Sequence, residues 1–85
     1  MYYVYILKSG KDGNLYIGYS ENLKRRITEH KAGKVFNTKH RLPIELVYYE
    51  AYKNIDDAKE REMSFKRSGA VHNGLVKRIK RSVDN

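Results

Sequence analysis

Cysteine and tryptophan are absent from this chain of 85 residues, and proline occurs only once. The lack of cysteine excludes disulfide frameworks, thiolate zinc sites, iron–sulfur ligation and a cysteine nucleophile. Long apolar runs are missing too. The run at residues 1–7 has no basic segment before it and is too short for a signal peptide or a membrane span. These absences predict a soluble, cytoplasmic protein.

The length limits what the chain can hold. A chain of 85 residues is expected to form one domain, here residues 1–85. Surface scaling predicts that such a domain buries roughly 60–65% of the surface of its unfolded chain, so its core is thin. A separate domain for substrate recognition does not fit within this length.

Acidic residues are scarce relative to basic ones. There are 10 Asp and Glu against 18 Lys and Arg, which gives a net charge of +8. No acidic residue occurs between Glu62 and Asp84, a stretch that holds Lys66, Arg67, Lys77, Arg78, Lys80 and Arg81. This surplus favours a polyanionic partner, because cations that neutralise phosphates release condensed counterions. The alternative is a solvated surface that keeps a small domain soluble.

The first 20 residues predict a β-hairpin. Two β-branched and aromatic runs, 2–8 and 15–19, are separated by turn-forming residues. Alternation with period two gives an aliphatic face, which holds Val4 and Ile6, and a tyrosine-rich face, which holds Tyr5.

The rest of the chain predicts one more strand and three helices. Ser20 is expected to cap a helix over 21–31, and polar residues 33–41 indicate a loop. Asn54 is expected to cap a helix that ends near Arg67. The remaining expected elements are a strand over 44–51 and a helix over 72–82. The predicted fold class is α/β (α+β), with a three-stranded, mainly antiparallel sheet flanked by helices in the order β-β-α-β-α-α.

One carboxylate interrupts the apolar stripe of the second helix. The stripe reads Ile55, Ala58, Glu62 and Phe65, so Glu62 occupies a position where the helical pattern requires an apolar side chain. A buried carboxylate must be paired or bind a cation, and such exceptions are enriched at functional sites. The alternative is a rotated helix in which Glu62 is a solvated surface charge.

Five polar residues form a composite pattern along the chain. Tyr5 and Tyr16 lie eleven residues apart, Arg26 follows ten residues later, and His30 and Glu62 complete the order. This pattern resembles the GIY-YIG nuclease superfamily over almost the whole chain, and most of all its short, stand-alone bacterial members. The resemblance implies a GIY-YIG endonuclease-like fold.

The first motif departs from the family pattern. It reads Tyr3-Val4-Tyr5, with Tyr in place of the family's Gly and Val in place of Ile. The bulk of Tyr3 beside the site could narrow substrate entry. In the second motif, Tyr16-Ile17-Gly18, we expect Gly18 to allow a close approach of the backbone.

The resemblance implies a metal-dependent endonuclease that hydrolyses phosphodiester bonds, with DNA expected ahead of RNA. It implies that Glu62 holds one divalent metal, Mg²⁺ or Mn²⁺, and that Arg26 binds the scissile phosphate. Tyr5 is the favoured general base if the metal or Arg26 lowers its pKa, and Tyr16 would bind a phosphate oxygen or water. His30 would assist proton transfer or contact phosphate; the alternative is a capping or surface histidine. For Arg26 and the tyrosines the alternatives are an exposed helical arginine and ordinary strand packing.

Basic residues elsewhere are candidates for docking nucleic acid, including branched or single-stranded DNA. The set is Lys34, Lys39, Arg41, Lys66, Lys77 and Arg78. Thr38, in the loop 33–41, is a further candidate for backbone contact. Phosphate contacts position a duplex without reading its sequence, which predicts low specificity unless a separate protein partner supplies it. No membrane partner is expected. The alternative function is a nucleic-acid-binding module of the same fold with little or no cleavage.

Overall fold

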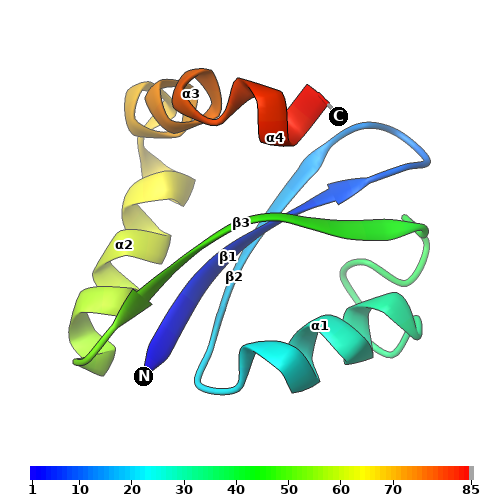
Figure 1. Ribbon diagram of the computed structural model, residues 1–85, viewed down its shortest axis with the longest axis horizontal. Coiled ribbons are helices and arrows are strands. Elements are labelled where there is room, and N and C mark those ends of the chain that lie inside the picture. The colour runs from blue at the N-terminus through cyan, green and yellow to red at the C-terminus, as the bar shows by residue number, and fades with distance from the viewer. Residues whose placement is uncertain (85) are drawn as a thin grey trace.

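One antiparallel sheet with strand order β2-β1-β3 organises the computed structural model, which describes residues 1–84 (Figure 1). Within these residues there are three strands and four helices: β1 (Tyr2–Ser9), β2 (Leu15–Ser20), α1 (Leu23–Lys31), β3 (Ile44–Tyr52), α2 (Ile55–Arg67), α3 (Gly69–Arg78) and α4 (Lys80–Asp84). The predicted hairpin and fold class are confirmed. The predicted helix count is too low by one.

The central strand β1 supplies side chains to both faces of the sheet. Val4, Tyr5, Ile6 and Leu7 are each at most 1% exposed, because β1 is the central strand and a core cluster covers its side chains on each face. In the register, Tyr5 lies opposite Gly18 of β2 and opposite Tyr49 of β3. The catalytic candidate Tyr5 is therefore placed at the centre of the sheet.

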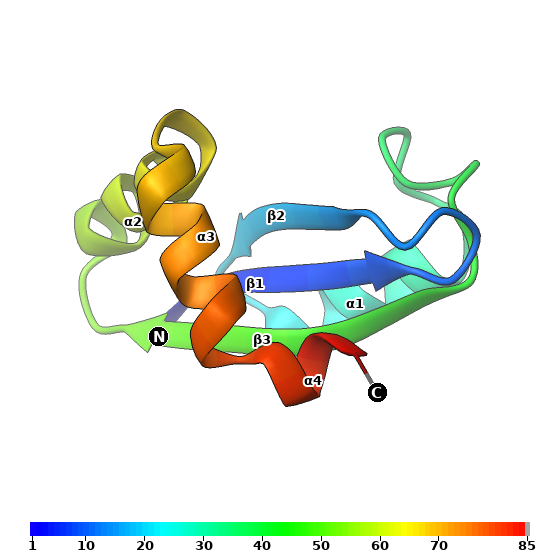
Figure 2. The ribbon, with the colours of Figure 1, turned by 90° about the horizontal axis from the view of Figure 1, so that it is seen from above.

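Helices cover the sheet on both sides (Figures 1 and 2). On one side, Val4 and Ile6 pack in a core cluster with Phe65 of α2 and Leu75 of α3. On the other side, a second cluster joins Tyr5 and Leu7 of β1 to Ile27 of α1, with Ile44 of β3. The alternation of the hairpin is confirmed, but the side expected to be aliphatic also receives Tyr2, Tyr19, Tyr48 and Tyr52.

The first helix begins later than predicted. Asn22, not Ser20, is the N-cap of α1, and its side chain accepts a hydrogen bond from the backbone N–H of Arg25. Ser20 ends β2, and its hydroxyl accepts from the backbone N–H of Asn22 at 3.0 Å. Both residues are good caps, and the local pattern did not show that β2 extends as far as Ser20. The cap predicted at Asn54 and the end of α2 at Arg67 are confirmed.

The predicted helix over 72–82 is wrong in two respects. Helix α3 starts at Gly69, because the Ser68 side chain caps it by accepting from the backbone N–H of Val71. The helical path then breaks at Ile79, so that α4 follows as a separate short helix. Beyond this break Val83 is buried, and its carbonyl accepts a hydrogen bond from Lys8 Nζ at 2.6 Å. No helix within residues 1–84 has the length and apolar character needed to cross a membrane.

Candidate active site

The Tyr5 ring lies over Gly18, its register partner in β2. A Cβ atom at position 18 would collide with the Tyr5 hydroxyl and ring, with ring atom Cε1 only 2.9 Å away. The expectation that Gly18 lets the backbone approach closely is met, but the group that approaches is the Tyr5 side chain. Gly18 of the second motif thus provides the space for Tyr5 of the first motif.

His30 lies at the centre of a buried polar cluster and is 0% exposed. Its Nε2 atom is 3.0 Å from the Tyr5 hydroxyl, and its Nδ1 atom is 2.7 Å from Oγ1 of Thr38. The rings of Tyr5 and Tyr16 lie 5.6 Å and 5.4 Å from the imidazole, centroid to centroid. We call Tyr5, Tyr16, His30 and Thr38 the His30 cluster. His30 is therefore neither a cap nor a surface residue.

Burial keeps Tyr5 and His30 of this cluster neutral. Desolvation lowers the pKa of His30 to about 4, and the positive charge of Arg26 acts in the same direction. Desolvation also raises the pKa of Tyr5, although a hydrogen bond from Arg26 and its positive charge oppose the shift. The protein surroundings therefore raise the pKa of Tyr5 rather than lower it, and near neutral pH both Tyr5 and His30 are uncharged.

Arg26 connects this buried cluster to the surface. Its side chain is 38% exposed, and Nη1 lies 3.4 Å from Oε1 of Glu29 in the same helix. Hydrogen bonding to Tyr5 is the main cause that raises the pKa of Arg26, so the guanidinium stays charged. Arg26 is thus a partly exposed cation that pairs with Glu29 and whose charge also acts on the Tyr5 hydroxyl.

Glu62 reaches the same region from α2. Its neighbours in the stripe, Ala58 and Phe65, are buried, so the helix is not rotated as in the alternative interpretation. The Glu62 side chain is 19% exposed, and Oε2 lies 3.3 Å from Lys66 Nζ. Its negative charge contributes to the raised pKa of Tyr5, which places Glu62 within electrostatic range of the His30 cluster.

The donor set at Glu62 fits one weakly held divalent cation. Within residues 1–84 no group of three or more His, Asp or Glu side chains is placed so that it could hold a metal ion. A single carboxylate offers hard oxygen ligands, which suit Mg²⁺ or Mn²⁺ when waters and substrate phosphate complete the coordination. Glu62 fits such a site because its ion-pair partner, Lys66, has a flexible side chain that is 52% exposed and can move away.

The predicted docking residues divide into two groups. Lys34 and Lys39 are exposed in the loop after α1, and Lys66 lies beside Glu62. Arg41 in the same loop is partly buried, and its Nε atom lies 3.4 Å from Oδ2 of Asp12. These four residues lie in the loop after α1 or on α2, the two helices that carry Arg26, His30 and Glu62.

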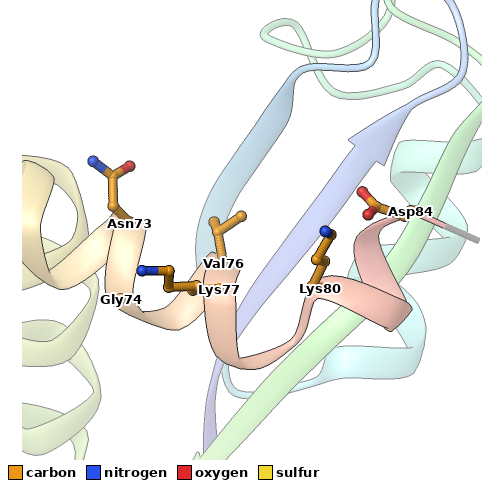
Figure 3. Close-up of a pocket in the computed structure, with 6 residues that line it drawn as sticks. All are labelled: Asn73, Gly74, Val76, Lys77, Lys80 and Asp84. Atoms are coloured by element: carbon orange, nitrogen blue, oxygen red, sulfur yellow. The ribbon is translucent and has the colours of Figure 1, made fainter.

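Lys77 and Arg78 belong to a different side of the molecule. They lie on α3, which packs on the sheet through Leu75 on the face opposite α1. A surface cavity of about 420 Å³ runs along α3 and α4 (Figure 3), lined by Asn73, Gly74, Val76, Lys77, Lys80 and Asp84. The structure therefore does not bring these two residues together with Arg26 and His30.

Two polar features were not found from the sequence. Thr38, expected to contact a nucleic-acid backbone, is instead fully buried against His30. On the other face, Glu50 accepts hydrogen bonds from Tyr48, Tyr52 and Arg61, a set that we call the Glu50 cluster. The spacing of Tyr48, Glu50 and Tyr52 at every second residue of one strand was a signal that could have indicated it.

These features define a protein class. Two strand tyrosines, an arginine and a histidine on α1, and a glutamate within electrostatic range on α2 match the composite pattern of the motifs. The family model described as the GIY-YIG catalytic domain matches residues 1–74. The chain therefore belongs to the GIY-YIG family, which supports a nuclease-type function and nucleic acid as the substrate.

Among individual proteins, the chain is similar to bacterial UPF0213 proteins. The UPF0213 protein of Staphylococcus haemolyticus is 46% identical over 66 residues, covering 76% of this chain and 79% of that protein. A UPF0213 protein of Streptococcus pyogenes serotype M5 is 41% identical over 66 residues, covering 76% and 71%. The solution NMR structure of a UPF0213 protein from Bacillus halodurans has a TM-score of 0.59 at 38% identity, covering 91% of this chain and 84% of that chain.

Proposed function

We propose that this protein is a metal-dependent endonuclease that hydrolyses phosphodiester bonds, with DNA as its substrate and with low sequence specificity. The observation that carries the proposal is the Tyr5 hydroxyl, which lies 3.0 Å from Nε2 of His30 and within electrostatic range of the Arg26 guanidinium. It joins a partly exposed cation to a buried proton acceptor, and phosphodiester hydrolysis needs both functions.

Arg26 is the proposed phosphate-binding residue. Its planar guanidinium can form two parallel hydrogen bonds to phosphate oxygens, which an ammonium group cannot do. The Arg26 side chain is 38% exposed, and its contact with the Glu29 carboxylate is long, 3.4 Å from Nη1 to Oε1. A phosphate can therefore compete for it, and we propose that its movement toward the phosphate uncovers the Tyr5 hydroxyl for a water molecule.

Tyr5 and His30 are the proposed route for the proton. As the water oxygen bonds to phosphorus, its proton passes to the Tyr5 oxygen, and the Tyr5 proton passes to Nε2 of His30 at 3.0 Å. The bond from phosphorus to the 3′-side oxygen then breaks. Tyr5 never has to ionise alone, which suits its raised pKa, and the low pKa of His30 ensures a neutral acceptor before the reaction.

Glu62 is the proposed ligand of Mg²⁺ or Mn²⁺. When bound, the metal would supply positive charge for the departing oxygen. Lys66, whose side chain is 52% exposed, would exchange its contact with the Glu62 carboxylate for a contact with the substrate backbone.

Docking is proposed to use mainly the residues on the α1 side, Lys34, Lys39 and Arg41, with Lys66. These residues contact phosphates rather than base edges, so they support binding without sequence selection. A separate protein partner is proposed to supply any specificity. Lys77 and Arg78 are proposed as a second, weaker contact for branched or single-stranded DNA that extends around the domain.

The proposal is tested with plasmid, single-stranded DNA, branched DNA and RNA, each incubated with Mg²⁺, Mn²⁺ or a chelator. We expect cleavage that requires metal, and we expect Glu62→Gln and Arg26→Lys to lower it by about 100-fold or more. Glu60→Gln and Arg25→Lys are matched controls, because both residues are exposed on the same helices. The controls should cleave like the wild type.

Two results would contradict the proposal. One is full activity in Glu62→Gln or Arg26→Lys. The other is no cleavage of any substrate with either metal. If DNA binding then persists in the chelator and in Glu62→Gln, the protein is the nucleic-acid-binding module of the alternative hypothesis.

A further inference from the structure

Phe36 is the most exposed large apolar side chain in residues 1–84. Its exposed fraction is 79%, compared with 52% for the aromatic side chain of Tyr49 on β3. Single exposed apolar residues are ordinary on protein surfaces, so exposure alone does not indicate a site. What distinguishes Phe36 is the turn that carries it.

A tight turn holds Phe36 at its tip. The turn is closed by the N–H of Thr38, which donates to the carbonyl of Val35 at 3.1 Å, and Phe36 and Asn37 lie between these two residues. Both ends are buried: Val35 is 6% exposed, and Thr38, which lies 2.7 Å from His30, is 0% exposed. The domain therefore holds the phenyl ring outward in advance, which lowers the entropy cost of binding through it.

The turn lies in a basic segment. No acidic residue occurs between Glu29 and Glu45, a stretch that holds Lys31, Lys34, Lys39 and Arg41. Lys39 Nζ lies over the Phe36 ring, 5.0 Å from its centroid. Proteins bind single-stranded nucleic acid with this combination, because an aromatic ring stacks on a base while nearby cations contact the backbone.

The surroundings of the turn favour nucleic acid over an apolar partner. A membrane or an apolar protein surface would have to bury Asn37 and the neighbouring cations together with a single phenyl ring. The turn is also connected to the candidate active site, because Thr38 contacts His30 and His30 contacts Tyr5. Figure 2 shows the loop between α1 and β3 projecting from the domain at the end away from α2. A strand bound at the candidate active site thus needs only a few nucleotides to reach the ring.

We propose that Phe36 is a base-stacking residue, which binds an unpaired base of single-stranded or branched DNA while Lys34 and Lys39 contact the flanking phosphates. Every base has an aromatic face, so the contact does not select a sequence. A base inside an intact duplex is stacked on its neighbours and is not available to the ring. The consequence for cleavage, a preference for substrates with unpaired nucleotides, rests on the nuclease function proposed above, whereas the binding itself does not.

The test measures binding by fluorescence anisotropy, with a labelled single-stranded oligonucleotide and with the same sequence as a duplex. A chelator is present so that nothing is cut. Phe36→Leu keeps an apolar side chain but removes the aromatic ring. We expect it to weaken binding of the single strand by about 5- to 50-fold and binding of the duplex by less than about 2-fold. The salt dependence should stay the same, because no cation is removed.

Tyr49→Leu is the matched control, because it removes an exposed aromatic ring that lies outside the loop. It should bind both oligonucleotides like the wild type. Phe36→Trp provides a second measurement. The chain has no tryptophan, so the fluorescence of this variant reports on position 36 alone. We expect the single strand to quench this fluorescence and the duplex to quench it much less, because only an unpaired base can stack on the indole.

Equal effects of folded Phe36→Leu on the single strand and the duplex overturn the proposal, and so does a wild type that binds no single-stranded DNA. If Phe36→Leu does not fold, the fluorescence of Phe36→Trp decides, and an absence of quenching by the single strand overturns the proposal. Binding to vesicles of anionic phospholipid that depends on Phe36, without a selective loss on the single strand, makes the ring a membrane contact and also overturns it.

The stacking role and the nuclease function can fail separately. If the wild type cuts DNA and Phe36→Leu binds and cuts every substrate equally well, the stacking role is wrong and the nuclease function stands. If no substrate is cut but Phe36→Leu loses binding of the single strand selectively, the nuclease proposal fails and the stacking role stands.

Discussion

The Glu50 cluster and the His30 cluster lie on opposite faces of the same sheet, and each combines two tyrosines with a buried or partly buried titratable group, Glu50 in one and His30 in the other. At Glu50, Arg61 donates from Nε at 2.9 Å and from Nη2 at 3.2 Å, and Tyr48 donates at 2.6 Å. At His30, the partners are one phenol and one alcohol, and the nearby Arg26 pairs with Glu29 rather than with His30. The first cluster holds an ion pair, whereas the second excludes charge from its centre.

This difference suits the Glu50 cluster to stabilising the fold and the His30 cluster to transferring a proton. Burial alone would raise the pKa of Glu50, but hydrogen bonds from Arg61, Tyr48 and Tyr52 lower it below its usual value. Burial and the bonds to Glu50 raise the pKa of Tyr48 and of Tyr52 to about 12. Every group there is held in one protonation state. His30 keeps a basic nitrogen 3.0 Å from a hydroxyl, so a proton can move along the contact.

The largest expected effects distinguish the two clusters directly. His30→Gln should lower metal-dependent cleavage by about 100-fold or more, because it removes the proton acceptor. Glu50→Gln should leave the cleavage rate of the folded protein unchanged but lower its free energy of unfolding by about 2–3 kcal/mol, because Arg61 loses its charged partner. Cleavage assays and urea denaturation measure the two effects.

The controls are His72→Gln and Glu45→Gln, which replace a histidine of α3 and an exposed glutamate of β3. Neither should change activity or stability appreciably. A loss of cleavage in folded Glu50→Gln that equals the loss in His30→Gln would show that the functional distinction between the clusters is wrong.

The pH dependence of stability should separate the clusters as well. The pKa of His30 falls from 6.5 to about 4 on folding, so between these values the unfolded chain binds a proton that the folded chain does not. This contribution is complete above pH 6.5 and is lost as the pH falls toward 4, by about 3 kcal/mol. Glu50, with its lowered pKa, loses its contribution only below its usual value of 4.5.

Urea denaturation of the wild type and of His30→Gln at several pH values checks this prediction. The wild type should lose stability between pH 6.5 and 4.5, and the variant should lose much less over the same interval. An identical loss in both proteins would show that another group is responsible.

A smaller effect is expected from the contact between Tyr5 and Gly18. Gly18→Ala should lower the free energy of unfolding by about 1–3 kcal/mol, because its Cβ displaces the Tyr5 ring. In a Tyr5→Ala background the same change should cost much less, since the colliding ring is gone. A double-mutant cycle by urea denaturation measures this coupling. Additive effects of the two changes would contradict the proposed cause.

The smallest effect is expected at Lys66. Its contact with Glu62 is 3.3 Å long, and its side chain is 52% exposed, so solvent screens the pair. Lys66→Ala should change the free energy of unfolding by less than about 0.5 kcal/mol. The same variant should weaken DNA binding, measured by fluorescence anisotropy at several salt concentrations, with a shallower salt dependence than the wild type. An unchanged salt dependence would remove Lys66 from the docking set.

The sequence predicted helix boundaries and buried faces correctly where only one residue was a good candidate for the position. Asn54 and the two aspartates after it predicted the start of α2 correctly, and the stripe through Ala58 and Phe65 predicted its buried face. The start of α1 was wrong because Ser20 and Asn22 are both suitable caps. The break at Ile79 had no local signal in the sequence; α4, which follows it, contacts β3 and accepts a hydrogen bond from the distant Lys8 through Val83.

The sequence by itself determined the alternation of β1 and β2, the fold class, the family and the set of polar residues expected at the site. Only the tertiary structure decided the state of those residues. The pairing of Tyr5 with His30 spans 25 positions in the chain, and the pairing of His30 with Thr38 runs from a helix into a loop. Burial at these contacts keeps both groups neutral, and burial depends on packing that no local pattern encodes. For this reason the sequence suggested Thr38 as a surface contact for nucleic acid, whereas the structure shows it fully buried.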